Sequence, residues 1–134
     1  MSEPSTWLVL LLSGIFVLLG FVFLAAPRSG AALFGIPAPE GASLAYLPAI
    51  GLRDLAFGLY LLALSCLSTK RTLGVIFGVT LLIPVGDIVI VAAERGLSAP
   101  FPLLLHGVSA AVMAATSIWL LRQALQHTQK DIRA

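Results

Sequence analysis

Charged residues and cysteine are scarce in this chain of 134 residues. Only 10% of the residues are charged and 59% are hydrophobic, whereas roughly 25% are charged in a typical soluble domain. A soluble core of this length cannot bury so much apolar surface, so we expect much of the chain to face the lipid bilayer. Cys66 is the single cysteine, which excludes an internal disulfide, a CxxC redox pair and a cysteine-based zinc site.

Other functional signatures are missing as well. The net charge is only +2, and the basic residues form no patch with interleaved aromatics, so nucleic acid is not an expected partner. The sequence has no nucleotide-binding motif and no nucleophile constellation. One histidine and two aspartates within apolar stretches make a poor metal site once an arginine pairs with an aspartate. We therefore expect neither a metal nor a cofactor.

The chain does contain four apolar stretches, each close to the roughly 20 residues that cross a bilayer as a helix. They are residues 7–26, 48–67, 73–93 and 100–121. The polar tail 122–134 is expected to continue the last helix into water. The sequence thus predicts an all-α fold, with one membrane domain over 1–134 that forms an integral bundle of four transmembrane helices.

The first stretch has an alternative interpretation as a secretory signal peptide. The region before it carries Glu3 and no basic residue, and a cut after Ala26 would place Pro27 beside the scissile bond. Both features are unfavourable for a cleaved signal. We therefore expect residues 7–26 to be retained as a membrane span.

The basic residues outside the spans predict the orientation in the membrane. The side that holds the two termini carries five of them: Lys70, Arg71, Arg122, Lys130 and Arg133. The opposite side carries Arg28 and Arg95. Cytoplasmic loops are enriched in Lys and Arg, so the N- and C-termini are both expected on the cytoplasmic side.

Four ionisable residues lie inside the predicted spans: Arg53, Asp54, Asp87 and His106. With a rise of 1.5 Å per residue, Arg53 lies about 8 Å, and Asp87 and His106 about 9 Å, from the same outer boundary. Each charge at mid-helix costs about 2.5–3.5 kcal/mol on insertion scales, so exposure to lipid is unfavourable. The four side chains are therefore expected to face inward and to meet in one cavity.

The expected pairing follows from helix geometry. Arg53 and Asp54 are successive residues about 100° apart around a helix and are poor partners for each other. We expect the Arg53 guanidinium to pair with Asp87 of the neighbouring span, which leaves Asp54 for His106. The four groups carry a net charge of −1 if His106 is neutral and zero if it is protonated.

Three further residues are candidates for the wall of the same cavity. Tyr60 follows Arg53 by seven residues, and Ser109 and Met113 share a helix face with His106. Each of them could contact a substrate. Plain packing is the favoured alternative for Tyr60, whereas Ser109 and Met113 could form the apolar floor.

Glycine and proline positions indicate helix contacts. Gly51 and Gly58 share a face, and Gly74 and Gly78 form a GxxxG pattern, both typical of close helix packing. Pro84 is expected to kink the third span near the cavity.

The motifs "FGIP" (34–37), "GLRDLAFG" (51–58), "VGDIVIV" (85–91) and "LLLHG" (103–107) together resemble a family of small membrane proteins described as a domain of unknown function, DUF4267. The resemblance covers nearly the whole chain, from the first span to the fourth. It implies a four-helix membrane protein and supplies no established activity.

The favoured functional hypothesis is a small membrane enzyme that isomerises, cyclises or hydrates a lipophilic small molecule. In it, His106 is the acid or base, Asp54 orients His106, and Arg53 with Asp87 stabilises developing negative charge. A structural or partner subunit, with the ion cluster as a packing clamp, is the alternative. A third hypothesis is a proton-coupled transporter, which would act as a homodimer because four helices are few for alternating access.

Overall fold

The computed structural model describes the backbone of residues 4–133 and the side chains of residues 4–126. Its helices are α1 (Pro4–Ala25), α2 (Pro27–Phe34), η1 (Gly41–Ala45), α3 (Tyr46–Leu67), α4 (Lys70–Thr80), α5 (Leu82–Arg95), η2 (Gly96–Ser98) and α6 (Pro100–Arg133). No strand occurs among the described residues, which confirms the predicted all-α class. Four helical stretches are long and apolar enough to cross a membrane: Pro4–Ala25, Gly41–Leu67, Lys70–Ser98 and Pro100–Gln126.

Local chemistry sets several of the helix ends. Pro100 opens α6, at a helix position where the missing N–H group is not needed. The Thr69 hydroxyl accepts a hydrogen bond from the backbone N–H of Thr72 at 3.2 Å and caps the start of α4, as threonine commonly does. Gly35 ends α2 with a φ of 102°, a left-handed conformation that glycine adopts without a steric penalty.

The third membrane stretch is divided into α4 and α5 at Leu81. Pro84 lies three residues beyond this break and is buried. Its nitrogen cannot donate to the carbonyl of Thr80, and its ring presses on that carbonyl, so the helix cannot continue regularly through this point. The predicted kink is thus a break between α4 and α5, and Asp87 follows this break on α5.

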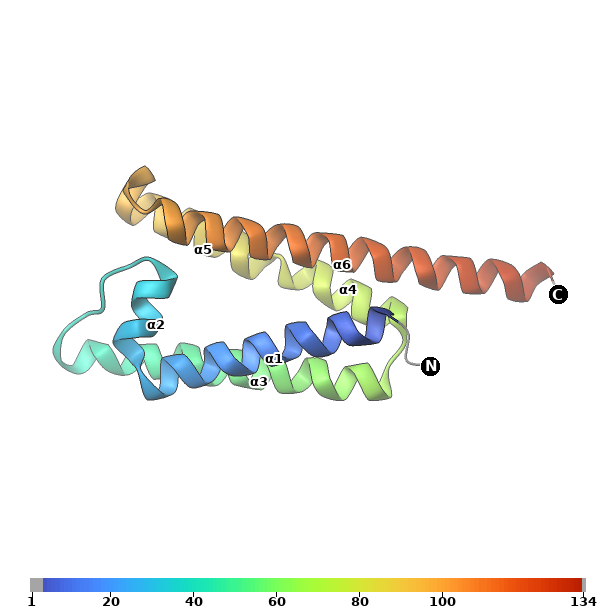
Figure 1. Cartoon of the computed structure of the whole chain (residues 1–134), viewed down its shortest axis with the longest axis horizontal. Coiled ribbons are helices and arrows are strands. Elements are labelled where there is room, and N and C mark those ends of the chain that lie inside the picture. Colours follow the sequence, from blue (N-terminus) through green and yellow to red (C-terminus); the bar gives the residue numbers. More distant parts are fainter. Residues whose placement is uncertain (1–3, 134) are drawn as a thin grey trace.

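The helices form two groups, α1 with α3 and α4–α5 with α6. The first pair packs closely because glycines face each other, and a Cβ atom added to Gly51 would lie 2.7 Å from the carbonyl oxygen of Gly20. In the second group, the Ser117 hydroxyl of α6 donates to the carbonyl of Gly74 at 2.7 Å. Figure 1 shows the two groups closest near α4 and diverging toward α2.

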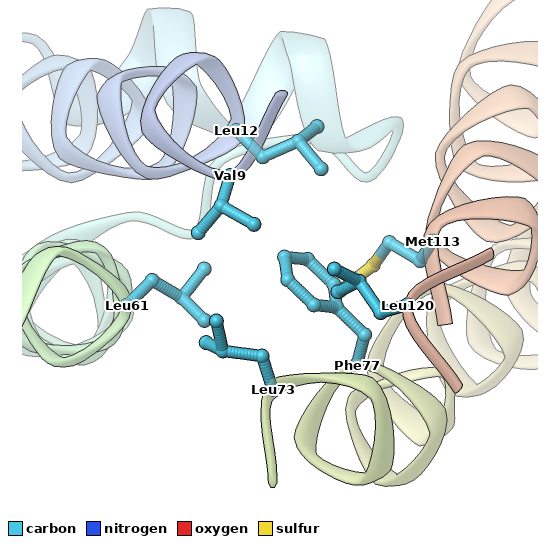
Figure 2. Packing of buried hydrophobic residues seen from close by; sticks show 7 residues of the cluster. All are labelled: Val9, Leu12, Leu61, Leu73, Phe77, Met113 and Leu120. Atoms are coloured by element: carbon cyan, nitrogen blue, oxygen red, sulfur yellow. The ribbon is translucent and has the colours of Figure 1, made fainter. Parts of the chain in front are cut away.

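One apolar cluster joins the two groups, and we call this part of the bundle the closed end. Figure 2 shows its seven side chains pointing toward one another: Val9, Leu12, Leu61, Leu73, Phe77, Met113 and Leu120. They come from α1, α3, α4 and α6, and Leu61 and Phe77 are completely buried. The closed end therefore holds the four membrane stretches together on one side of the site described below.

Candidate functional site

Between the diverging helix groups lies a cavity of about 340 Å³, which we call the open end. All four ionisable residues predicted from the sequence line it, namely Arg53, Asp54, Asp87 and His106. Most of the remaining wall is apolar: Leu12, Ile15, Phe16, Leu19, Phe23, Leu33, Phe34, Ile50, Ile83, Pro84, Leu105, Val108, Val112 and Met113. The expected convergence of the charged groups on one cavity is therefore observed.

Helices α5 and α6 supply the first polar pair. The Nδ1 atom of His106 lies 3.5 Å from Oδ2 of Asp87, and both side chains are largely buried. The other ring nitrogen, Nε2, lies 3.0 Å from the backbone carbonyl oxygen of Phe34 at the end of α2. The Phe34 ring also packs edge-on against the imidazole, with the ring centroids 5.2 Å apart. Both nitrogens of His106 are thus engaged.

These contacts favour some protonation states of the Asp87–His106 pair over others. A carbonyl oxygen can only accept, so Nε2 of His106 carries a hydrogen and donates it to Phe34. Nδ1 then faces the Asp87 carboxyl group, where two lone pairs without a proton would repel. The contact is favourable when an imidazolium faces a carboxylate or when a neutral imidazole faces a carboxylic acid. In both states one proton lies between Asp87 and His106 and the pair is neutral.

Helix α3 supplies the second polar pair. The Nε and Nη2 atoms of Arg53 donate to the same oxygen, Oδ1 of Asp54, at 3.1 and 3.0 Å. Asp54 is buried, whereas about half of the Arg53 side chain, 51%, stays exposed. The prediction that these neighbours are poor partners is wrong. The long arginine stem spans the angular separation and brings the guanidinium back beside its neighbour.

The ion pairs predicted between different helices, Arg53 with Asp87 and Asp54 with His106, are also wrong. Within residues 4–126, no ion pair joins Arg53 to Asp87 or Asp54 to His106. Each pair instead stays within its own helix group. Both pairs nevertheless line the same cavity.

The three weaker candidates divide into two groups. Ser109 and Met113 line the cavity, as the helix face of His106 predicts. Tyr60 does not line it, and 65% of its surface is exposed. The inward face of α3 passes through Leu61, which is completely buried, and Tyr60 lies about 100° away from it around the helix. The expectation that Tyr60 lines the cavity is therefore wrong.

Two further contributors come from the loop side of the site. Phe34 supplies both a carbonyl oxygen and a ring to His106. Arg95 donates from Nη1 to the carbonyl oxygen of Gly35 at 3.1 Å. These contacts fasten the end of α2 to α5 and α6. The only sequence signal for them is the motif "FGIP", whose backbone, rather than its side chains, makes both polar contacts.

In the described part of the chain, no three histidine, cysteine or carboxylate side chains are grouped closely enough to hold a metal ion. Among known proteins, the family model described as "Domain of unknown function (DUF4267)" matches residues 13–120 of the chain. This range includes all four ionisable residues of the cavity. No curated protein and no solved structure gives a significant match.

Proposed function

The chain belongs to the DUF4267 family, whose function is unknown, and from this premise we propose that it catalyses acid–base chemistry on an uncharged lipophilic molecule. The observation that carries the proposal is the Asp87–His106 pair at the wall of an otherwise mostly apolar cavity. Proton transfer by positioned carboxyl and imidazole groups is a common source of catalysis. Ionisable groups within membrane helices are costly and are typically functional.

The contacts of Asp87 and His106 favour roles for them that differ from those expected from the sequence. His106 is bound through both ring nitrogens and has no free nitrogen for a substrate. Asp87 has no hydrogen-bond or ion-pair partner other than His106 among the described residues, so its second oxygen, Oδ1, is free to exchange a proton with a bound molecule. In this proposal Asp87 is the acid or base, and His106 positions it and supplies or takes up the shared proton.

Arg53 has the complementary role. Asp54 engages its Nε and Nη2 atoms, so the hydrogens of Nη1 remain for a ligand oxygen. A guanidinium held in this way stabilises negative charge that develops on an oxygen during the reaction. Asp54 thereby positions Arg53 rather than His106. Isomerisation, cyclisation and hydration all fit a proton donor or acceptor opposite such a group.

The charge of the cavity favours an uncharged ligand. Arg53 with Asp54 is neutral, and Asp87 with His106 is neutral when it holds its single proton. A charged ligand would thus enter the site without a compensating group, which is unfavourable in a medium of low dielectric constant. The apolar wall and the four membrane-length helices support entry from the bilayer, with the polar part of the molecule near Arg53 and Asp87.

Untargeted mass spectrometry of lipophilic extracts tests the proposal. In native cells, Asp87→Asn is expected to raise one species and deplete another. Equal masses would indicate isomerisation or cyclisation, and a difference of one water would indicate hydration. Glu94→Gln is the matched control, because it removes an exposed carboxylate from the same helix outside the cavity. Unchanged profiles in a folded Asp87→Asn protein would refute the enzyme.

A packing clamp is the second candidate, because His106 and Arg95 both fasten α2 to the rest of the bundle. In that case replacing Asp87 and His106 together by apolar residues should be tolerated better than replacing either alone. Lipophilic extracts should then show no difference between the wild type and any folded variant.

We also propose that both termini face the cytoplasm. Lys70 and Arg71 begin α4 at one end of the bundle, whereas Arg28 and Arg95 lie at the other, and this bias supports the orientation. Lys130 and Arg133 belong to the same argument, but their side chains lie outside the described ones. Cys66 is an exposed free cysteine near the opposite end of the bundle, so the test uses a Cys66→Ser background. In that background, Ser98→Cys is expected to react with an impermeant label from outside sealed vesicles, and a lack of reaction would contradict the orientation.

A further inference from the structure

A second pocket lies at the α2 end of the bundle, and it shares no lining residue with the cavity described above. It has a volume of about 260 Å³ and is lined by Arg28 and Ala32 of α2, by loop residues 35–38 and by Arg95 of α5. Loop residues 35–37 belong to the "FGIP" motif, which the proposed chemistry uses only through the carbonyl oxygen of Phe34. The pocket is therefore a separate concave surface with two cationic groups from different helices.

The two arginines are available for an anion. Arg28 is exposed and makes no hydrogen bond or ion pair with any described residue. Arg95 is held by the Gly35 carbonyl through Nη1 alone. Neither Glu40 nor Glu94 lines the pocket, and neither pairs with these arginines within residues 4–126. No carboxylate thus neutralises the two positive charges.

The position of the arginines also indicates what they meet. Arg28 follows the last residue of α1, Ala25, by three positions, and Arg95 is the last residue of α5. Both lie where apolar membrane-length helices end, which is the level of lipid headgroups in a bilayer. A ligand bound at this depth would therefore be surrounded by lipid headgroups rather than by acyl chains.

We propose that this arginine pocket binds the phosphate of an anionic phospholipid headgroup. A guanidinium offers paired N–H donors that match two phosphate oxygens, and each such charge-assisted bond is stronger than a neutral one. Two arginines from α2 and α5 converge on one phosphodiester, and the lipid then links the α2 segment to α5. The proposal does not depend on the reaction proposed for the cavity.

Native mass spectrometry of the full chain in detergent tests the pocket, with phosphatidylglycerol, phosphatidylcholine and inorganic phosphate as separate probes. The wild type is expected to retain one phosphatidylglycerol in preference to phosphatidylcholine. Arg28→Gln should lower that retention about tenfold, since it removes charge-assisted bonds. Because Arg28 has no described contact to lose, this variant isolates binding from folding.

Two matched variants complete the experiment. Arg71→Gln removes an exposed arginine at the start of α4, outside both pockets, and should retain the lipid as the wild type does. Arg95→Lys keeps the charge but loses the paired donors, and should bind more weakly than the wild type. Equal retention by the Arg28→Gln and Arg71→Gln variants would overturn the site. Full competition by excess inorganic phosphate would support phosphate recognition and overturn the lipid as its source.

Discussion

The closed end and the open end of the bundle are built by opposite means. At the closed end, apolar side chains from α1, α3, α4 and α6 fill the space between the two helix groups. At the open end the same groups diverge around a cavity, and hydrogen bonds to the backbone of α2 connect them. The difference shows that one part of a small bundle can stabilise the fold. Another part can then keep charged groups, which are costly to bury, beside a cavity.

The largest expected effect comes from opening the closed end. Phe77 is completely buried there, so Phe77→Ala should lower the free energy of unfolding by about 3–5 kcal/mol, because the cavity left behind is only partly refilled. Val75→Ala on the exposed face of the same helix is the control and should be close to neutral. Unfolding in detergent, followed by circular dichroism, measures both. Similar losses for the two variants would show that the closed end is not the stabilising part.

The next effect concerns the close approach of α1 and α3, which form one of the two helix groups. Gly51→Ala would place Cβ 2.7 Å from the carbonyl oxygen of Gly20, and the helices must separate, with an expected loss of about 1–3 kcal/mol. Gly14→Ala on α1 is the matched control, because no atom lies within 4 Å of its added Cβ. The same unfolding assay applies, and a Gly51→Ala protein as stable as the Gly14→Ala protein contradicts the close contact.

Double-mutant cycles compare the two polar pairs of the open end. For Asp87→Asn with His106→Gln, which keeps an N–H group near Phe34, we expect a coupling energy of about 1–2 kcal/mol in unfolding experiments. For Arg53→Gln with Asp54→Asn we expect less than about 1 kcal/mol, because the arginine is half-exposed. Equal coupling energies, or a larger one for Arg53 with Asp54, would mean that burial does not determine which pair is more strongly coupled.

The smallest effect is expected at Tyr60. Its side chain faces away from the cavity, so Tyr60→Phe should change stability by less than about 0.5 kcal/mol and leave the lipophilic extracts unchanged. Ser109→Val, on the cavity wall, is the informative comparison for the extracts. An altered profile for Tyr60→Phe alone would return this tyrosine to the site.

The sequence allowed the four membrane-length helices to be predicted because their length and hydrophobicity are local properties. It also placed Arg53, Asp87 and His106 at one cavity, because depth along a helix follows from residue number. The pairing could not be predicted in the same way. Arginine has a long flexible stem, so the direction of its helix position does not determine which carboxylate it meets.

The contribution of α2 was harder to foresee. Its sequence, PRSGAALF, carries one charged residue, Arg28. The contacts from the end of α2 to His106 and Arg95 are made by the main-chain carbonyl oxygens of Phe34 and Gly35. Every residue carries such a carbonyl group. No side-chain pattern therefore distinguishes this segment from an ordinary loop before the fold brings it beside α6.

The hydrogen bond between the Phe34 carbonyl and His106 connects the end of α2 to the cavity. One ring nitrogen contacts the main chain and the other faces Asp87, so a displacement of α2 from α6 would break the Nε2 contact and change the surroundings of the imidazole. A spectroscopic probe of that one ring would therefore follow the position of α2 without any label on α2 itself.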